Sequence, residues 1–392
     1  MRYQSKIVLL LTSLLVVCFA EDELKRIHSG FAAQANNEKI TYVLTDYEFQ
    51  DITINGQTFK KPIIPFGGLN AGEGDPVLPT VTTFYQVAPN KSYSIEVNIQ
   101  SSEFVENIDI APHQTWDPVT DEITLPFKRN IDLYTSDEPY PQKQASISQT
   151  IVFRDLPVVK VVLTPFKYYP LSRQLEVITA AEIQLVEAAE REPIQRPVRR
   201  SRVFEPLYEA LVVNYSRSTN DEDYQKPSIL YILPNNSSNL MSNLDILFEW
   251  RHKSGYVVNY ASTSTTGTST SSIKNYISNA YSNWTDPPEY VALVGDASGS
   301  YSIPTYFENY SSYNGEGDHP YSQLVGGDIL PEVILGRLSF SSTTELATII
   351  NKTVQYETNP YVSQNWFHSA SMVGDPSSSG ISTIITLSLI HI

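Results

Sequence analysis

Hydrophobic and polar residues alternate one by one through much of the first half of the chain. Stretches with this period of two lie between Tyr42 and Val186, and prolines and glycines separate them. Asn55-Gly56 closes one stretch and favours a hairpin turn, because both residues tolerate positive φ. A period of two puts the apolar side chains on one face of a strand, so we predict an antiparallel β-sandwich. Its strands are expected over residues 47–54, 92–99, 146–152, 158–163 and 175–185.

The period changes in the second half of the chain, where apolar strands alternate with stripes of helical spacing. Asn239 precedes one stripe as a candidate N-cap, and Gly255 ends it. Ser342 and Glu345 form a capping box for another stripe. Strands with two apolar faces belong inside a parallel sheet, so we predict an open, doubly wound α/β domain. Its strands are expected over residues 228–233, 256–260, 289–294, 332–336 and 371–374, with a further helix over 273–281.

Between the two patterns, residues 189–202 hold five arginines, two prolines and few apolar residues. This composition predicts an exposed linker. Arginines in an accessible segment are sites that a protease with basic specificity can cleave, which makes Arg196, Arg200 and Arg202 candidates for activation cleavage. A solvated connector explains the same composition.

The first 20 residues have the order of a secretory signal peptide: two cations, an apolar run, and small residues at Cys18 and Ala20 before a cleavage point. The apolar run is shorter than a bilayer requires, and Val17 does not suit a lipid-attachment site. We predict secretion to the cell surface or medium, without a transmembrane segment. Because Cys18 is the only cysteine, the mature segment has no thiol and no disulfide.

The charge balance disfavours nucleic acid as a partner. The 392 residues carry 27 Lys and Arg against 43 Asp and Glu, a formal charge of −16, which repels phosphate. The chain is long enough for two or three domains. It contains no HExxH, G-x-S-x-G or P-loop motif, and its six histidines show no ligand spacing.

Two strand ends repeat the phrase Val-Gly-Asp, at Asp296 and Asp375. The carboxyl ends of strands form the ligand crevice of an open α/β sheet, so both carboxylates are expected near a site. The alternative is that Gly-Asp only starts a turn.

A region between Gly315 and Glu332 is rich in carboxylates. Hard oxygen ligands can hold calcium, although the spacing does not match an EF-hand loop. A calcium site and a solvated acidic loop both fit this composition. The candidate ligands are Asp318, Asp328 and Glu332.

Five sequence segments resemble, in their order and spacing, the first half of the gingipain-type cysteine peptidase domain. They are residues 289–296, Ile303-Pro304, residues 318–321, 324–328 and 332–337. Upstream, Gly72-Glu-Gly-Asp-Pro76 with Leu78-Pro79 resembles a phrase of the prodomain that precedes such peptidases. The resemblance covers residues 42–375 and implies a secreted zymogen, with a β-sandwich prodomain before a caspase-like catalytic domain that acts on proteins or peptides.

In that family the nucleophile is a Cys and its partner a His, and both would follow residue 386. The two groups are needed together, because a neighbouring base forms the thiolate and backbone donors hold the oxyanion. Since both would follow residue 386, the resemblance assigns no catalytic residue to this chain. It places Asp375 beside the active site and makes the prodomain an inhibitor. Arg129 could then present a basic side chain to an acidic pocket, whereas the plain alternative is an exposed basic residue.

Residues 387–392 look like a translated sequencing adapter, so we interpret the chain as truncated near Thr386. Two rival interpretations stay open at this point: a non-catalytic exported binding or adhesion protein with a degenerate peptidase-like domain, and a nucleotide-binding Rossmann protein, which lacks the required Gly-rich turn. The predicted division is a signal peptide (1–20), a prodomain (21–188), a linker and activation segment (189–225), a partial peptidase domain (226–386) and an adapter artefact (387–392).

Overall fold

The computed structural model describes residues 25–359, apart from 29, 37, 66, 115, 118–121, 124–125, 137, 191–198 and 311–312. The chain forms two compact units. Most residues before the linker belong to the first unit and most residues from Arg217 onward to the second. Two short segments depart from this order: Leu207–Ser216 belongs to the first unit and Ile151–Pro157 to the second. The signal peptide, the strand predicted over 371–374, Asp375 and residues 387–392 lie outside the described residues.

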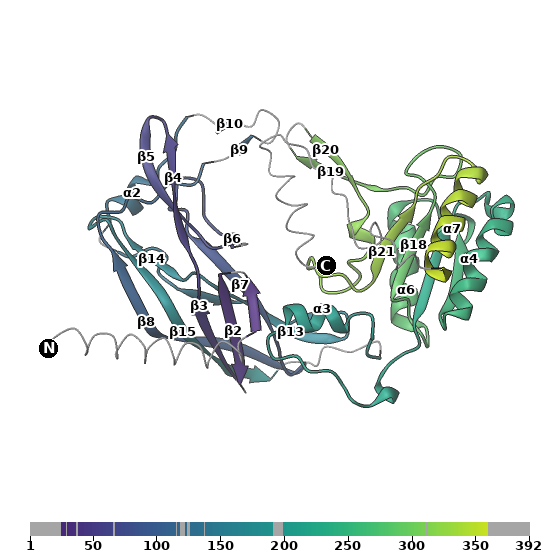
Figure 1. Cartoon of the computed structure of the whole chain (residues 1–392), viewed down its shortest axis with the longest axis horizontal. Coiled ribbons are helices and arrows are strands. Elements are labelled where there is room, and N and C mark those ends of the chain that lie inside the picture. The colour runs from purple at the N-terminus through teal and green to yellow at the C-terminus, as the bar shows by residue number, and fades with distance from the viewer. Residues whose placement is uncertain are drawn as a thin grey trace. The chain divides into compact units, whose positions relative to one another are not determined.

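The first unit is built from antiparallel strands, as predicted (Figure 1). A six-stranded sheet has the order β1-β2-β3-β15-β14, with β8 also paired to β15. A five-stranded sheet has the order β11-β13-β7-β6, with β12 paired to β13. The first sheet comprises β1 (Lys25–His28), β2 (Phe31–Asn36), β3 (Lys39–Leu44), β8 (Lys91–Val105), β14 (Phe166–Tyr169) and β15 (Gln174–Glu190). The second comprises β6 (Gly68–Leu69), β7 (Pro79–Gln86), β11 (Ala145–Ile147), β13 (Leu156–Leu163) and β12 (Ile151–Phe153), of which β12 belongs to the segment counted with the second unit.

One apolar core joins these two sheets, which makes the unit a sandwich. Ile40 and Val177 from the first sheet and Val81 and Val161 from the second belong to the same cluster and are fully buried. The hairpin predicted at Asn55-Gly56 is confirmed, with φ of 50° and 77° at these two residues. The remaining elements of this part of the chain are β4 (Glu48–Ile54), β5 (Gln57–Ile63), β9 (Trp116–Asp117), β10 (Glu122–Ile123) and α2 (Ile131–Tyr134).

The second unit contains a four-stranded parallel sheet of order β17-β16-β18-β21. Its strands are β16 (Ser228–Leu233), β17 (Val257–Ser262), β18 (Tyr290–Val294) and β21 (Ile334–Leu338), and its longer helices are α4 (Met241–Lys253), α6 (Thr270–Asn283) and α7 (Thr343–Thr358). The shorter elements in this half of the chain are α3 (Glu205–Leu211), η1 (Asp221–Asp223), η2 (Ser237–Asn239), α5 (Thr263–Thr266), β19 (Tyr306–Tyr310), β20 (Tyr313–Gly317) and η3 (His319–Tyr321).

Helices cover both faces of this parallel sheet (Figure 1). Ile229 and Tyr231 of β16 pack into the cluster that contains α4 and α7, whereas Leu230 and Ile232 pack with α6 on the opposite face. Every residue of β16 is buried, which explains its unbroken apolar sequence. The α/β architecture predicted from the alternating pattern is confirmed.

Local details differ from the predictions at three helix starts. Asn239 is not the cap of α4, because Leu240 holds that position and the Asn239 side chain donates a hydrogen bond to Tyr301 Oη at 2.7 Å. The helix predicted over 273–281 begins earlier, at Thr270 of α6, which is capped by Ser269, and the short helix α5 precedes it. At α7, Ser342 accepts from the Glu345 N–H as predicted, but the Glu345 carboxylate accepts from the N–H of Ser341.

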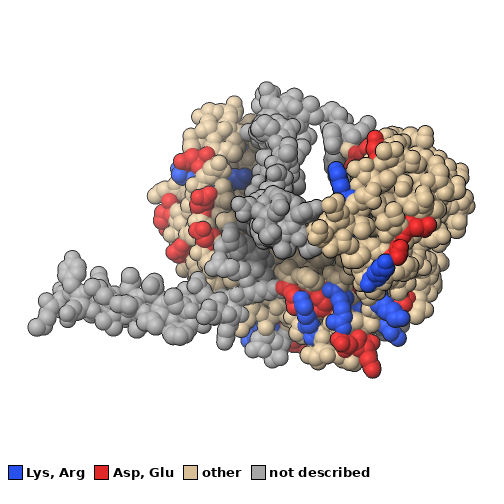
Figure 2. Space-filling view, turned by 45° about the vertical axis from the view of Figure 1, so that its right-hand side comes forward, with Lys and Arg blue, Asp and Glu red and all other residues tan. Residues whose placement is uncertain are grey.

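Acidic and basic side chains lie interspersed on the face drawn in Figure 2. The described residues form exposed ion pairs, such as Lys253–Glu249 and Arg202–Asp221. In the described part of the chain, no helix has the length and apolar character needed to cross a membrane.

Candidate functional site

A polar crevice opens at the carboxyl ends of β16, β17 and β18. These strands run parallel, so the loops that follow them meet at one edge of the sheet. The chain runs from β16 to β17 on one side and then crosses to β18 on the other side of β16. Ligands bind at such a switch in strand order in open α/β sheets. The crevice has a volume of about 410 Å³ and is lined by Pro234, Asn235, Asn236, Thr263, Thr268, Ala297, Ser300, Ser302 and Pro304.

Gly295 shapes the wall of this crevice after β18. Its φ of +146° lies in a region that favours glycine, and a Cβ at this position would lie 2.0 Å from the carbonyl oxygen of Tyr301. The loop therefore folds back close to the strand end, where Ile303 N–H donates to the carbonyl oxygen of Asp296 at 2.8 Å. The close approach and the positive φ explain why a glycine precedes Asp296.

Asp296 lies beside the crevice and is partly exposed. Its carboxylate accepts hydrogen bonds from the N–H of Ala297 at 2.8 Å and from the hydroxyl of Ser339 at 2.9 Å. These donors lower the pKa of Asp296 below its usual value. Asp296 therefore stays ionised, and its hydrogen bonds link the ends of β18 and β21. It is both a turn residue and a carboxylate at a strand end, the two roles considered for it.

Arg337, at the carboxyl end of β21, joins the loops around the crevice. Its guanidinium donates to both carboxylate oxygens of Asp318 at 2.7 Å, and to the carbonyl oxygens of Gly295 and Ile303 at 3.0 and 2.8 Å. Such a bidentate Arg–carboxylate pair fixes the relative orientation of the two side chains. Sequence analysis did not single out Arg337. The only local signal that could have identified Arg337 as a candidate site residue is its position at the end of a strand in a parallel sheet.

The three predicted calcium ligands are not brought together. Asp318 pairs with Arg337, Asp328 accepts from the N–H of Leu330 at 2.8 Å, and Glu332 accepts from the N–H groups of Leu324 and Val325. Burial raises the pKa of Asp328, and it raises that of Glu332 to about 7. Over the described ranges, no three His, Cys, Asp or Glu side chains form a group that could hold a metal ion. These residues thus serve as loop anchors in the structure.

Arg129 is engaged within the first unit. Its guanidinium lies 3.0 Å from Asp109 Oδ1 and 4.0 Å from the centre of the Tyr134 ring, and it also faces Phe59. Arg129 is therefore half-buried, because three neighbours shelter its side chain.

The candidate cleavage arginines differ in their surroundings. Arg196 lies outside the described residues. The backbone of Arg200 pairs with Asp223 and Gln225, and the following residue, Ser201, is fully buried. Arg202 forms an ion pair with Asp221 at 2.5 Å and stacks on Tyr224. A protease needs an extended, accessible backbone, which the paired Arg200 segment does not offer.

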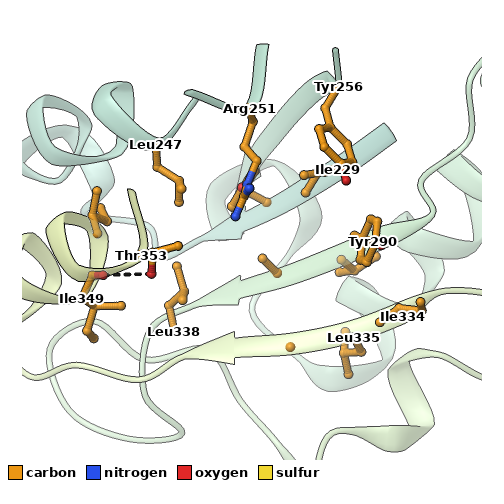
Figure 3. Close-up of a pocket in the computed structure, with 15 residues that line it drawn as sticks. Ile229, Leu247, Arg251, Tyr256, Tyr290, Ile334, Leu335, Leu338, Ile349 and Thr353 are labelled. Atoms are coloured by element: carbon orange, nitrogen blue, oxygen red, sulfur yellow. Dashed lines mark hydrogen bonds between the residues drawn. The ribbon is translucent and has the colours of Figure 1, made fainter. Parts of the chain in front are cut away.

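A second cavity, of about 370 Å³, lies between the sheet and helices α4 and α7 (Figure 3). Leu247, Ile334 and Leu338 contribute to its mainly apolar lining. The guanidinium of Arg251 reaches it, but both of its terminal nitrogens donate to the Glu357 carboxylate, at 2.5 and 2.8 Å. This cavity offers little polar chemistry, so the crevice at the strand ends is the better candidate site.

Comparison with known proteins identifies the family. A model of peptidase family C25 matches residues 222–389, and a model of the C25 propeptide matches residues 24–219, which is half of the chain. The chain belongs to peptidase family C25. In this C25 chain, the crevice lies in the peptidase part, and the β-sandwich lies in the propeptide part.

The related proteins are gingipains of Porphyromonas gingivalis. Gingipain R2 of strain ATCC BAA-308 / W83 is 23% identical over 351 residues, covering 86% of this chain and 46% of the relative. Lys-gingipain HG66 is 24% identical over 339 residues, covering 81% of this chain and 19% of the relative. The C25 chain thus spans less than half the length of these relatives.

Solved structures of gingipains match over a smaller share of the chain. A complex of RgpB pro- and mature domains from Porphyromonas gingivalis matches with 19% identity and a TM-score of 0.38, covering 50% of this chain and 97% of that one. A structure of gingipain K from the same organism matches with 17% identity and a TM-score of 0.33, covering 42% and 96% of the two chains.

Proposed function

We propose that this chain is the amino-terminal part of a gingipain-like cysteine endopeptidase precursor that hydrolyses peptide bonds in proteins or peptides. The observation that carries the proposal is the crevice at the carboxyl edge of the parallel sheet, in the part of the chain that matches peptidase family C25. It lies at the switch point where α/β folds bind ligands. The caspase-like form of the domain is part of this proposal.

The catalytic groups of the completed enzyme would be a Cys and a His that follow residue 386. The His would take the thiol proton, the thiolate would attack the scissile carbonyl, and backbone N–H groups would stabilise the oxyanion. The C–N bond would then break, with the amine leaving on the proton held by the His, and water would hydrolyse the resulting thioester to release the acid and restore the thiol. The residues described here would hold the crevice walls. Asp296 and Arg337 fix the loops after β18 and β21, and Asp375 is proposed to lie near the active site.

Latency would come from the propeptide part, acting as an inhibitor of its own peptidase. Arg129 stays a candidate for the inhibitory contact, but its side chain would first have to leave Asp109 and Tyr134. We further propose a secreted or cell-surface location, with residues 1–20 removed as a signal peptide. Any calcium bound by the completed enzyme would need ligands other than the three predicted ones acting together.

Activation would require a cut between the propeptide and peptidase parts. Arg196 is a better candidate than Arg200 or Arg202, because buried Ser201 and Phe204 anchor the chain around the latter two. A further candidate is Arg217, which sequence analysis missed. It is exposed and lies just before residue 219, where the propeptide match ends. Sequencing the amino terminus of the processed enzyme would decide among these sites.

The test of the proposed function is to obtain the coding sequence beyond residue 386 and express the completed precursor. We expect a Gly-His-Gly loop followed by a Cys at a strand end, and hydrolysis of peptides with Arg or Lys before the scissile bond. Replacement of that Cys by Ala should abolish hydrolysis. A complete domain that lacks the Cys and the His would overturn the peptidase proposal and favour an exported binding protein.

A further inference from the structure

Arg154 is a fully buried arginine in the turn between β12 and β13, and it has the largest side chain among the fully buried residues of the described chain. It belongs to the segment Ile151–Pro157, which falls within the propeptide match but forms part of the second compact unit. Its φ of +55° is strained for a residue with a side chain. An arginine seldom occupies a fully buried site unless it is paired.

The guanidinium of Arg154 is surrounded by acceptors from the peptidase part of the chain. It donates to the carbonyl oxygens of Pro288, at 3.2 Å, and of Glu332, and to the side-chain oxygen of Gln225 at 3.1 Å. These residues precede β18, β21 and β16 respectively, so they lie together at the amino edge of the parallel sheet. We name this group of acceptors the arginine socket.

Aromatic rings and buried carboxylates complete the arginine socket. The guanidinium carbon lies 4.9 Å from the centre of the Phe204 ring and 5.4 Å from that of Tyr281, whose hydroxyl donates to the Arg154 carbonyl oxygen at 2.7 Å. The side chains of Glu289 and Glu332 are buried nearby; burial raises the pKa of both groups, and the Arg154 charge opposes that rise. The socket therefore suits a planar cation through its hydrogen-bond acceptors and aromatic rings.

The socket is far from the candidate active site. The crevice lies at the carboxyl ends of the same strands, and a five-residue strand separates the two edges by roughly 15 Å. Arg154 is therefore not placed as a substrate mimic in the crevice. It holds a propeptide segment at the opposite edge of the sheet.

We propose that Arg154 anchors the propeptide to the peptidase unit, so that the propeptide stays bound after the connecting chain is cut. The partner is the propeptide turn Phe153-Arg154-Asp155, and the surface that receives it is the arginine socket. This inference rests on the proposed function for its role in latency, but the binding itself does not require peptidase activity.

The test uses the 392-residue chain with a recognition sequence for a site-specific protease inserted between Thr219 and Asn220, two exposed residues. After cleavage, dilution and size-exclusion chromatography measure the Kd between the two fragments. We expect the parent fragments to elute together. Arg154→Ala should weaken the complex at least about 100-fold, because it leaves buried acceptors and carboxylates without their cation. Arg154→Lys should give an intermediate Kd, because an ammonium group cannot reproduce the planar fork.

Arg173→Ala is the matched control. Arg173 also follows a strand in a turn, with a φ of +54°, but it is exposed. Its replacement should leave the Kd unchanged. The proposal is overturned if Arg154→Ala changes the Kd less than about threefold, or if the parent fragments separate on cleavage.

Thermal unfolding of the uncut Arg154→Ala chain shows whether the variant folds. If it does not, Arg154→Lys and Gln225→Met decide, and an unchanged Kd in both overturns the anchor. Fragments that separate would leave the proposed peptidase activity intact, whereas a downstream sequence without the Cys and His would leave the anchor intact. The two failures are therefore distinguishable.

Discussion

The two edges of the parallel sheet use charged side chains in opposite ways. At the amino edge, Arg154, Glu289 and Glu332 are buried to within 1% exposure and surrounded by the chain itself. At the carboxyl edge, Asp296 and the Arg337–Asp318 pair stay partly exposed beside an open crevice. Buried charges at the amino ends of the strands and a solvent-accessible crevice at their carboxyl ends thus belong to the same sheet.

This contrast separates charges that hold the chain together from charges that shape a site. Full burial makes an unpaired charge costly, so the loss of a partner at the amino edge should be strongly destabilising. Partial exposure lets solvent compensate for lost contacts, so the carboxyl edge can vary while the sheet persists.

Replacing Arg337 by alanine is expected to lower the free energy of unfolding most within the carboxyl edge, by about 2–4 kcal/mol. The change removes the hydrogen bonds to Asp318 and to the carbonyl oxygens of Gly295 and Ile303. Urea unfolding followed by the fluorescence of Trp250 and Trp284 measures it. Arg337→Lys keeps the charge without the planar fork and should lose less. Equal losses in the two variants would show that the fork geometry does not matter.

Stability should depend on pH through Glu332. Its folded pKa of about 7 exceeds the ordinary 4.5, because burial disfavours the charged form. Between these values the folded state binds more protons than the unfolded state, so stability falls as the pH rises, by up to about 3 kcal/mol. Glu332→Gln should remove this part of the slope, and Glu316→Gln, at an exposed position, should not. A slope that is unchanged by Glu332→Gln would contradict the prediction.

Gly295→Ala should destabilise the crevice wall by about 1–3 kcal/mol, because the loop must move away from the new methyl group. Its Cβ would meet the carbonyl oxygen of Tyr301 at 2.0 Å, and its φ is +146°. Gly336→Ala is the control, since nothing lies within 4 Å of a Cβ there. Thermal unfolding of both variants compares them, and similar midpoints would count against the close approach.

Asp296→Ala should change stability least, because solvent reaches the carboxylate and can replace its two donors. In the completed enzyme, however, we expect kcat/KM to fall at least about tenfold, because the loop that lines the crevice loses its attachment to Ser339. Ser339→Ala should have a smaller effect in the same direction. Full activity of the Asp296→Ala enzyme would remove this residue from the candidate site.

Much of the fold could be predicted from local patterns. The strand and helix periods, the Asn55-Gly56 turn and the end of α4 just before Gly255 each depend on residues close together in the chain. The strand predicted over 146–152 divides into β11 and β12, and β7 of the same sheet was not predicted. The site was predicted in part. Strand-end Asp296 lies beside the crevice, but the predicted calcium ligands each hold a different loop.

The two architectures follow from the amino-acid sequence alone, because hydrophobic periodicity acts within each strand or helix. The identity of the buried charges and of their partners follows from long-range packing. Nothing near Arg154 in the sequence indicates burial, because its acceptors lie 71 to 178 residues away. Desolvation of a charge depends on everything that surrounds it in space, and long-range packing sets those surroundings.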